Sequence, residues 1–443
     1  MTNTLYTNDN LFILTGMNSN SVDLIYLDPP FNSKRFYAAP VGSKAAGTSF
    51  KDMWTWQDVN EAYLETLANE YPALALFIGD VGAIHSSAMK AYLTYMAQRI
   101  IEMHRVLKDT GSIYLHCDPT ASHYLKIALD EIFGKNNFRN EITWERTTNS
   151  GSSKGIAKKF PNDHDTIFFY TKQSNIFKFN NIFKGYSQTY INHYYIYDDN
   201  DGKGKYQLQA LRTVSSDRLK KLKAENRIVK GKGKYLRYKD YLNDKKGVPV
   251  NDMWYDIEPV NPVSKERTGY PTQKPLALLH RIIKASSSEG DIVLDPFCGC
   301  ATTCVAAQQL NRKWIGIDIA EQASDVLVQR LSDDAGLFKD FVNTAIVPQR
   351  TDIKKEEKST SVKERLYEKQ NSLCNGCGFQ FNIQNLEIDH IIPKAKGGGD
   401  YYENYQLLCG SCNRIKGDRP MEYLQMKVKT RQETMKNKII FGE

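Results

Sequence analysis

Four consecutive residues near the start of this 443-residue chain could hold an amino group in place for a reaction. Asp28 ends an apolar run at 22–28, and Pro29, Pro30 and Phe31 follow it. Because proline has no backbone N–H, the two prolines leave carbonyl oxygens available as acceptors. The Asp28 carboxylate and the Pro29 carbonyl could therefore accept both hydrogens of an exocyclic amine, with Phe31 as a stacking surface. On their own, the same residues also suit a rigid turn.

The chemistry that such a pair of acceptors favours is attack by the amine nitrogen. The lone pair of an exocyclic amine is delocalised into its ring, which makes the nitrogen a poor nucleophile. Holding both hydrogens out of the ring plane would localise the lone pair toward an incoming methyl group. Positioning and electrostatics are sufficient for this step, and no covalent enzyme intermediate is needed.

A second candidate site is the small-residue sequence DPFCGCATT at 295–303, between a predicted strand and a predicted helix. Small residues there let backbone amides approach a ligand at a helix N-terminus. The next predicted strand ends at Asp318, 23 residues after Asp295, where a carboxylate commonly accepts hydrogen bonds from ribose hydroxyls. A generic strand–turn–helix unit would produce the same pattern, so both interpretations stay open.

The third candidate site contains half of the eight cysteines. Cys374 and Cys377 form one CxxC pair, and Cys409 and Cys412 form another after 31 intervening residues. This spacing is typical of a structural zinc site. The N-terminus shows no secretory signal, which favours zinc over disulfides. A plain zinc ribbon would have the same cysteine spacing.

The elements that must position these residues alternate between strands and helices. Predicted strands cover 22–28, 112–118, 165–171, 291–295 and 313–318, and predicted helices cover 88–107, 121–133, 275–288 and a segment after Thr302. This alternation predicts an α/β fold with a parallel sheet. The pattern lapses between about 172 and 262.

That central segment carries most of the excess positive charge. The whole chain has 59 Lys and Arg against 51 Asp and Glu, a net charge of +8. Residues 171–267 alone hold 20 basic and 11 acidic side chains, a balance of +9, and 10 of the 26 tyrosines. A basic, tyrosine-rich segment suggests contact with a polyanion, although a solvated lysine-rich surface is equally compatible. The chain has no membrane-spanning apolar run, and we expect a cytoplasmic protein.

The first two candidate sites together resemble those of DNA amino-methyltransferases that use S-adenosylmethionine. The motif order, with DPPF before the recognition region and the cofactor loop, is that of the β-type permutation, and the resemblance covers about residues 5–335. It implies that Asp28, Pro29 and Phe31, next to Pro30, hold a base flipped out of duplex DNA. It also implies a cofactor site with Asp295 near the cofactor amino group, and the remaining residues expected to line or adjoin that site are Asp9, Lys274, Phe297, Gly299, Thr302 and Asp318.

One residue departs from that family. Ala301 stands where the family usually has glycine, so the loop would be strained if this position requires a positive φ. Aspartate at the first position of DPPF is more typical of adenine-N6 enzymes than of cytosine-N4 enzymes. We therefore favour adenine N6 as the target, with cytosine N4 as the alternative.

The C-terminal region resembles the HNH endonucleases over about residues 363–420. The resemblance implies His390 as the general base that activates water for attack on a phosphodiester. Asp389 and Asn413 would hold one Mg²⁺ or Mn²⁺, and Asn404 would orient His390. The family's final histidine is Asn413 here, and we expect activity to be retained because an amide oxygen is an adequate hard ligand. The alternative is a zinc-stabilised DNA-binding module without nuclease activity.

The combined expectation is a Rossmann-like methyltransferase with circularly permuted motif order, an inserted target-recognition domain and a small zinc-containing ββα-metal HNH domain. We place the methyltransferase segment that contains DPPF at 1–172, the recognition domain at 173–262, the methyltransferase segment that contains the cofactor loop at 263–335, a linker at 336–362 and the nuclease domain at 363–443. The expected partner is double-stranded DNA, in a restriction–modification or phage setting. A DNA-binding regulator without catalysis is disfavoured because both methyltransferase motifs are present. The sequence leaves open whether the protein is a monomer or a homodimer.

Overall fold

The computed structural model describes most of the chain. The described residues are 3–31, 35–39, 43, 45, 49–52, 67–68, 70–147, 158, 160–212, 214–230, 235–261, 263–320, 325–330, 341–352, 358–421 and 423–428. They divide into two compact units, residues 1–180 with 252–443 and residues 181–251. Within the described residues, no helix is long and apolar enough to cross a membrane.

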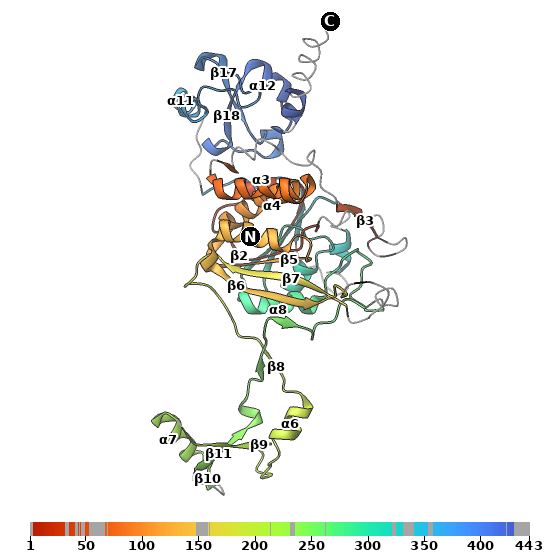
Figure 1. Ribbon diagram of the computed structural model, residues 1–443, viewed down its shortest axis with the longest axis vertical. Coiled ribbons are helices and arrows are strands. Elements are labelled where there is room, and N and C mark those ends of the chain that lie inside the picture. Colours follow the sequence, from red (N-terminus) through yellow and green to blue (C-terminus); the bar gives the residue numbers. More distant parts are fainter. Residues whose placement is uncertain are drawn as a thin grey trace. The chain divides into compact units, whose positions relative to one another are not determined.

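A nine-stranded sheet forms the centre of the first unit, in the order β13-β6-β7-β5-β2-β14-β15-β1-β16. Its strands are β1 (Asn3–Thr7), β2 (Val22–Leu27), β5 (Leu107–Cys117), β6 (Phe138–Glu145), β7 (His164–Thr171), β13 (Met253–Trp254), β14 (Ile292–Asp295), β15 (Lys313–Asp318) and β16 (Phe341–Thr344). Figure 1 labels β2, β5, β6 and β7 among them. The expected parallel arrangement holds except at β7, which pairs antiparallel with both β5 and β6. The reason is that β7 follows β6 and returns directly beside it, and a direct return makes an antiparallel pair.

Helices cover both faces of this sheet, as Figure 1 shows for α4 and α8. On one face lie α1 (Asn10–Gly16), α3 (Pro72–Ile84), α4 (Ser87–Val106), α5 (Ser122–Leu129) and the single π-turn η2 (Asp130–Gly134), followed by the 3-10 turn η3 (Lys135–Asn137). The other helices of this region are α8 (Leu276–Ser286) and α9 (Thr302–Gln309). A short hairpin, β3 (Arg35–Ala38) with β4 (Ser49–Asp52), adds a separate two-stranded sheet.

Alternation along the central strands divides their side chains between these two layers. Ile25 and Leu27 on β2 pack in the same core cluster as buried residues of α1, α3, α4 and α5. The intervening Tyr26 points to the opposite face, and so does Tyr114 of β5, whose hydroxyl bonds to Ser286 Oγ of α8 at 2.7 Å. Strands buried on both faces are expected of a sheet covered by helices on each side. The carboxyl ends of the central strands therefore stay fixed by packing on both sides.

The segment after β15 differs from the linker expected at 336–362. Residues 336–340 and 353–357 lie outside the described residues, but β16 within this range pairs in parallel with β1. Val347 is 6% exposed and belongs to the core cluster. The physical reason is that a strand at 341–344 and the buried Val347 precede the charged run, and both pack on the first unit.

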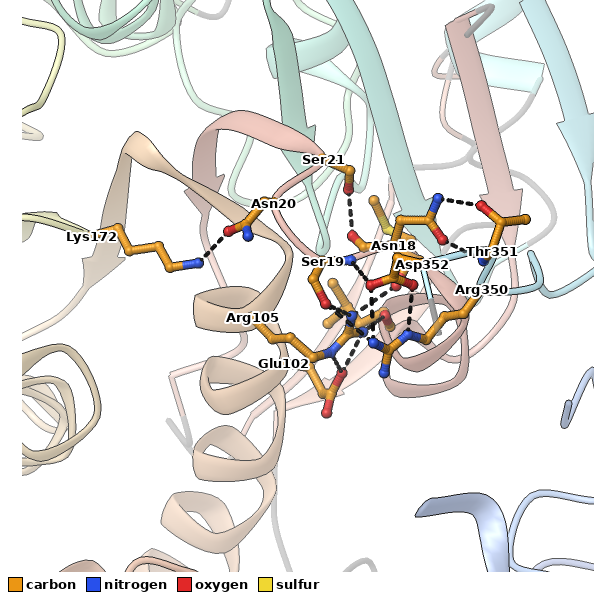
Figure 2. A network of polar contacts seen from close by, with 12 residues as sticks. Asn18, Ser19, Asn20, Ser21, Glu102, Arg105, Lys172, Arg350, Thr351 and Asp352 are labelled. Atoms are coloured by element: carbon orange, nitrogen blue, oxygen red, sulfur yellow. Dashed lines mark hydrogen bonds and ion pairs between the residues drawn. The ribbon is translucent and has the colours of Figure 1, made fainter. Parts of the chain in front are cut away.

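Polar contacts hold the end of this segment against the loop between α1 and β2 (Figure 2). Asn18 and Thr351 exchange two hydrogen bonds, at 2.7 and 2.8 Å. Asp352 accepts a hydrogen bond from the Ser19 backbone N–H at 2.9 Å and pairs with Arg350 at 3.0 Å. Residues 350–352 are thus held against the first unit rather than forming part of a free linker.

The second unit, residues 181–251, is narrower than the recognition domain expected at 173–262. Its elements are β8 (Phe183–Lys184), α6 (Gln188–Tyr194), β9 (Tyr206–Ala210), α7 (Ser216–Ala224), β10 (Ile228–Lys230), β11 (Leu236–Tyr241), η5 (Leu242–Asp244) and β12 (Val248–Pro249). Strands β9, β10 and β11 form one antiparallel sheet, and β8 pairs with β12. Residues 252–261 return to the first unit, where β13 pairs with β6.

The C-terminal region is a small ββα arrangement with its own core. Its elements are α11 (Thr360–Lys369), η6 (Ile383–Asn385), β17 (Leu386–His390), η7 (Lys394–Lys396), η8 (Tyr402–Asn404), β18 (Tyr405–Cys409) and α12 (Gly410–Lys416). Strands β17 and β18 pair antiparallel. The core beneath them includes Leu366, Leu386, Leu407 and Leu424 together with three of the paired cysteines.

Candidate active sites

A cavity of about 480 Å³ lies at the carboxyl ends of the central strands. Asp28 follows β2, Asp295 ends β14 and Asp318 ends β15, and β2, β14 and β15 are neighbours in the sheet. Ligands of open α/β sheets bind at this edge of the sheet. The cavity brings together all the residues predicted for the first two sites, which are Asp9, Asp28, Pro29, Pro30, Phe31, Lys274, Asp295, Phe297, Gly299, Thr302 and Asp318.

Asp28 and Lys274 form an ion pair on one wall of this cavity. Lys274 Nζ lies 2.5 Å from Asp28 Oδ2, although the two residues are 246 positions apart in the chain. The other carboxylate oxygen, Asp28 Oδ1, is buried and has no hydrogen-bond partner among the described residues. A buried acceptor without a donor is costly, so Oδ1 is available to a ligand with an N–H group. The resemblance placed Lys274 near the cofactor, whereas its ammonium contacts Asp28.

A buried relay that the sequence did not reveal supports the Phe31 side of the cavity. His116 lies at the carboxyl end of β5, and its Nε2 donates a hydrogen bond to Asp165 Oδ2 at 3.1 Å. Its Nδ1 lies 2.9 Å from Tyr26 Oη. Phe31 stacks on the His116 ring with centroids 6.2 Å apart. His116 and Asp165 are both less than 4% exposed. The sequence signal for this relay is weak, because it consists of a histidine and an aspartate on two predicted strands.

Asp295 lies at the other end of the cavity and is 4% exposed. Its carboxylate accepts hydrogen bonds from Thr303 Oγ1 at 2.5 Å and from the Phe297 backbone N–H at 3.1 Å. Burial nevertheless dominates and raises the pKa of Asp295 to about 7. A carboxylate poised near neutrality can pair with a cationic ligand, which would hold it in the ionised state.

Asp318 secures the cofactor-type loop from the next strand. Its Oδ2 accepts a hydrogen bond from the Gly299 backbone N–H at 2.8 Å, and its Oδ1 accepts one from Ala320 N at 2.8 Å. Burial raises its pKa above the ordinary range despite these bonds. Gly299 has a positive φ of 49°, and a Cβ atom there would lie 3.0 Å from the Tyr270 ring, close enough that the ring would have to shift. At this position the loop therefore presents backbone to the cavity.

Ala301 adopts a left-handed conformation with φ of 57° at the start of α9. The strain anticipated for a non-glycine residue at this position is therefore present. Left-handed backbone costs an L-residue about 1–2 kcal/mol. Thr302, the next residue, accepts a hydrogen bond from Arg330 Nη1 at 2.9 Å, and the same nitrogen donates to the Cys300 carbonyl at 2.7 Å. These bonds hold the strained loop in place.

Asp9 borders the cavity beside Phe297 but has protein partners of its own. It caps α1 by accepting a hydrogen bond from Leu11 N at 2.8 Å, and it pairs with Arg99 at 2.9 Å. Arg99 is 3% exposed and lies over the Tyr95 ring, 3.3 Å from its centroid. The sequence did not point to Arg99, because its position in the middle of an amphipathic helix resembles that of an ordinary core residue.

The four paired cysteines converge on one point in the C-terminal region. The sulfur atoms of Cys374, Cys377, Cys409 and Cys412 all lie within 4.8 Å of one another. They are the one group of three or more potential metal-ligating His, Cys, Asp or Glu residues within the described portion of the chain. Four thiolates at this separation fit around one tetrahedral zinc ion with Zn–S distances of about 2.3 Å.

A second polar cluster lies on β17, β18 and α12. Asp389 Oδ2 accepts a hydrogen bond from Gln406 Nε2 at 2.9 Å and pairs with Lys416 at 3.0 Å. Lys416 is completely buried and also donates to the His390 carbonyl at 2.8 Å. Asn413 donates from Nδ2 to Glu387 Oε2. Lys416 therefore neutralises Asp389, the carboxylate expected to bind a divalent ion. It contacts that carboxylate only at Oδ2.

His390 is held by Asp400 rather than by Asn404. His390 Nε2 lies 2.9 Å from Asp400 Oδ1, which also accepts a hydrogen bond from Tyr405 Oη at 3.0 Å. Asn404 instead bonds through its amide to the backbone of Ile392, at 2.8 and 3.1 Å. It thus shapes the loop after His390, because its amide supplies both a donor and an acceptor to that backbone. Burial lowers the pKa of His390, which favours the neutral imidazole.

Comparisons with known proteins match two separate parts of the chain. Residues 22–329 match the family model described as DNA methylase, and residues 374–419 match the one described as HNH endonuclease. Type II methyltransferase M.EcaI of Enterobacter cloacae is 32% identical over 283 residues, which cover 58% of this chain and 61% of that protein. DNA adenine methyltransferase YhdJ of Escherichia coli is 26% identical over 328 residues, covering 74% of this chain and 82% of YhdJ. A solved M1.HpyAVI complex with SAM is similar over 74% of this chain and 98% of its own, with 17% identity and a TM-score of 0.38.

Proposed function

This chain belongs to the DNA methylase family, and on that premise we propose that it transfers a methyl group from S-adenosylmethionine to the exocyclic amine of a base flipped out of double-stranded DNA. Adenine N6 is the favoured target, and the cytoplasm is the proposed location. The observation that carries the proposal is the buried Asp28 Oδ1, which has no partner among the described residues, in a cavity that also contains Asp295 and Asp318.

The acidic cavity fits the cofactor on charge. S-adenosylmethionine, when bound, supplies an electrophilic methyl group and carries both a sulfonium and an amino group. Asp295 would pair with the amino group, since a cation stabilises the ionised form of a carboxylate whose pKa is raised by burial. Asp318 would accept from the ribose hydroxyls, and the Gly299 backbone and Phe297 would line the remainder of the site.

The residues at the other end of the cavity would hold the base. Asp28 Oδ1 and the Pro29 carbonyl would accept the two amine hydrogens and keep the nitrogen lone pair directed at the methyl group. Phe31, backed by the His116 ring at 6.2 Å, would provide the stacking surface. Transfer of the methyl group from sulfur to the amine nitrogen would release one proton from the amine, and Asp28 would be placed to accept it.

The second unit is the proposed DNA-reading region. It contains most of the basic and tyrosine-rich segment 171–267, including a stack in which the Tyr186 and Tyr190 rings are 4.9 Å apart and inclined by 11°. Tyr190 and Tyr194 are 37% and 47% exposed. Lysine and arginine side chains would contact phosphates, which positions a protein on DNA but does not specify sequence.

Sequencing of modified bases in DNA from cells that express the protein tests this proposal. We expect N6-methyladenine at one recurring sequence, and none in cells that express Asp28→Ala. N4-methylcytosine at a recurring sequence would retain the methyltransferase and replace adenine with cytosine. Unmodified DNA from cells in which the protein is folded and abundant would contradict the proposed function.

For the C-terminal domain we propose metal-dependent DNA cleavage. His390, held by Asp400 and favoured in its neutral form, would accept the proton of the attacking water. Asp389 Oδ1 and the Asn413 side-chain oxygen would hold one Mg²⁺ or Mn²⁺, a hard ion that prefers such ligands. The amide orientation seen here, with Nδ2 on Glu387, leaves that oxygen for the ion.

The nuclease proposal is tested with purified protein, plasmid DNA and Mg²⁺. We expect wild type to nick or cut the plasmid, and His390→Ala to lose that activity while it keeps methyl transfer. Equal cleavage by both proteins would contradict the assignment of His390. Absence of cleavage by wild type on both methylated and unmethylated plasmid would favour a DNA-binding role for this domain.

A further inference from the structure

Lys274 is an unusual residue for a cavity that would hold a cationic cofactor. It is 9% exposed, and its ammonium lies among the side chains that line the site. One of its three N–H groups is used by Asp28 Oδ2 at 2.5 Å. Its contact to the Thr272 carbonyl, at 3.5 Å, is too long for a good hydrogen bond. A largely buried ammonium of this kind has donors to give to a ligand.

The adjoining carboxylate has the complementary need. Asp28 Oδ1 is a buried acceptor without a partner in the described portion of the chain, next to the oxygen that binds Lys274. The wall of the cavity therefore presents an acceptor and a donor side by side. Lys274 Nζ is also 5.5 Å from the centre of the Phe31 ring, beside the surface on which a base would stack.

An acceptor beside a donor matches one type of base edge. On the Watson–Crick edge of adenine the N6 amine donates and the adjoining N1 accepts, and on cytosine the N4 amine donates and the adjoining N3 accepts. Guanine and thymine present the reverse, a carbonyl oxygen beside a ring N–H. Enzymes that act on flipped bases read this edge by hydrogen bonds.

We propose that Lys274 donates a hydrogen bond to the ring nitrogen next to the target amine, so that Asp28 and Lys274 together recognise the donor–acceptor edge of an amino base. This inference rests on the proposed methyltransferase function and adds a specificity-determining residue to it. Guanine or thymine would place a carbonyl oxygen against the Asp28 carboxylate and an N–H against the ammonium. Such a base would leave the buried Asp28 oxygen and the Lys274 ammonium without hydrogen-bond partners, which costs more than the loss of a solvent-exposed hydrogen bond.

The pair also determines where the base edge lies. Because Lys274 binds Asp28 Oδ2, the carboxylate cannot rotate freely, and the direction of Oδ1 is fixed as well. The same lysine therefore has two roles that can be separated by experiment. Orientation of Asp28 would affect every substrate equally, whereas a bond to the ring nitrogen affects only substrates that have that nitrogen.

The experiment compares two substrates and three proteins. The substrates are duplexes with the mapped recognition sequence, one with the normal target adenine and one with 1-deazaadenine, in which a C–H replaces N1. If the mapped base is cytosine, 3-deazacytosine takes its place. The proteins are wild type, Lys274→Met and, as a matched control, Lys284→Met, because Lys284 is an exposed lysine on α8. Initial rates of labelled methyl transfer give kcat/KM for each pair, and titration gives the affinity for S-adenosylmethionine.

We expect wild type and Lys284→Met to lose about 10- to 100-fold in kcat/KM on the deaza substrate, the worth of one hydrogen bond to a charged group. Lys274→Met should lose at least a similar factor on adenine, because the orientation of Asp28 is weakened as well, and it should distinguish the two substrates by no more than about twofold. Its affinity for the cofactor should stay within about twofold of wild type. Any change in the intrinsic reactivity of the deaza amine is common to all three proteins and cancels in this comparison.

Three results would overturn the inference. Equal rates of wild type on both substrates would show that nothing reads the ring nitrogen, and this test needs no variant to fold. Full discrimination by Lys274→Met would assign the lysine only to the orientation of Asp28. Loss of cofactor affinity in Lys274→Met would place the lysine at the cofactor. A wild type that methylates no duplex would instead contradict the proposed function on which the inference depends.

Discussion

The two candidate sites of this chain are built in different ways. The methyltransferase cavity draws its residues from positions 8 to 319, and the order of strands in the large sheet brings most of them together. The HNH site takes its residues from positions 387 to 416, on one antiparallel pair and the following helix. A site whose residues are far apart in the sequence depends on a large hydrophobic core to hold them together. A site formed by a short segment has little core and depends on an additional stabilising group, such as a zinc ion bound by four thiolates.

The sites also balance charge differently. Among the described residues that line the cavity, the carboxylates of Asp9, Asp28, Asp295 and Asp318 outnumber the one ammonium, that of Lys274, which suits a cationic ligand. At the HNH site the completely buried Lys416 already neutralises Asp389. The cavity thus has more carboxylates than cations. At the HNH site, Asp389 already has a lysine partner, so a bound metal ion would have to displace some of the existing contacts. The effects expected from altering each site follow from this difference.

The largest effect should come from the four cysteines. Cys412→Ser, or removal of zinc by a chelator, should unfold the C-terminal domain, because a structural zinc ion contributes on the order of 10 kcal/mol to such a fold. Methyl transfer should continue, since the large sheet does not depend on the ion. Zinc analysis and calorimetry, in which only the transition of the C-terminal domain should disappear, would check this. Loss of methyl transfer together with zinc would show that the two sites are not independent.

The buried ion pair should give the next largest effect. Lys416→Met leaves the Asp389 carboxylate without its partner, and we expect the free energy of unfolding of the C-terminal domain to fall by about 3 kcal/mol. Denaturant unfolding followed by a probe in that domain measures the change. Lys396→Met, at an exposed position, is the control and should change little. Equal stability of the two variants would mean that Lys416 does not compensate Asp389.

The cavity should respond to pH through Asp295. Burial raises its pKa to about 7, so its carboxylate is protonated below that pH, and the cofactor Kd should rise by about tenfold for each pH unit below 7. For the protein without cofactor, the free energy of unfolding should depend on pH in the opposite direction to cofactor affinity. Because the folded pKa exceeds the unfolded value, the free energy of unfolding should fall as pH rises from about 4 to about 7 and then level off. Asp295→Asn should abolish both trends, and a cofactor Kd that is flat from pH 5 to 8 in wild type would count against the role of Asp295.

The smallest effect should come from the strained loop. Ala301 has a φ of 57°, and Ala301→Gly should raise the free energy of unfolding of the first unit by about 1 kcal/mol. Thermal or denaturant unfolding measures this gain. Ala306→Gly, in the middle of α9, is the matched control and should be destabilising instead. If both glycine variants lose stability, the left-handed conformation of Ala301 is not a source of strain.

The sequence alone was informative where a strand ends in a chemically distinctive residue. Asp28, Asp295 and Asp318 were identified because each follows an apolar run, and the sheet indeed brings them to one cavity. The four cysteines were identified from spacing alone, which is possible because their site is local. The apolar runs also predicted the five neighbouring strands β7, β5, β2, β14 and β15, apart from the direction of β7.

What the sequence could not provide were pairings across long separations. Lys274 was expected near the cofactor, but its partner Asp28 is 246 positions away. His116 and Asp165 look like ordinary strand residues until packing joins them. At the HNH site Asn404 was expected to orient His390, yet Asp400 holds the ring, because the intervening loop folds back. In each case the missing information was the tertiary partner rather than the residue type.

The most direct test of the central claim is the rate of labelled methyl transfer to DNA by Asp28→Ala, measured beside DNA cleavage and cofactor binding by the same preparation. We expect a loss of about 100- to 1,000-fold in methyl transfer, with cofactor affinity and cleavage unchanged. The cofactor contacts and the HNH site should remain intact, because neither is built on this carboxylate. Methyl transfer by Asp28→Ala at close to the wild-type rate would contradict the proposed role of Asp28 and, with it, the proposed chemistry of the cavity.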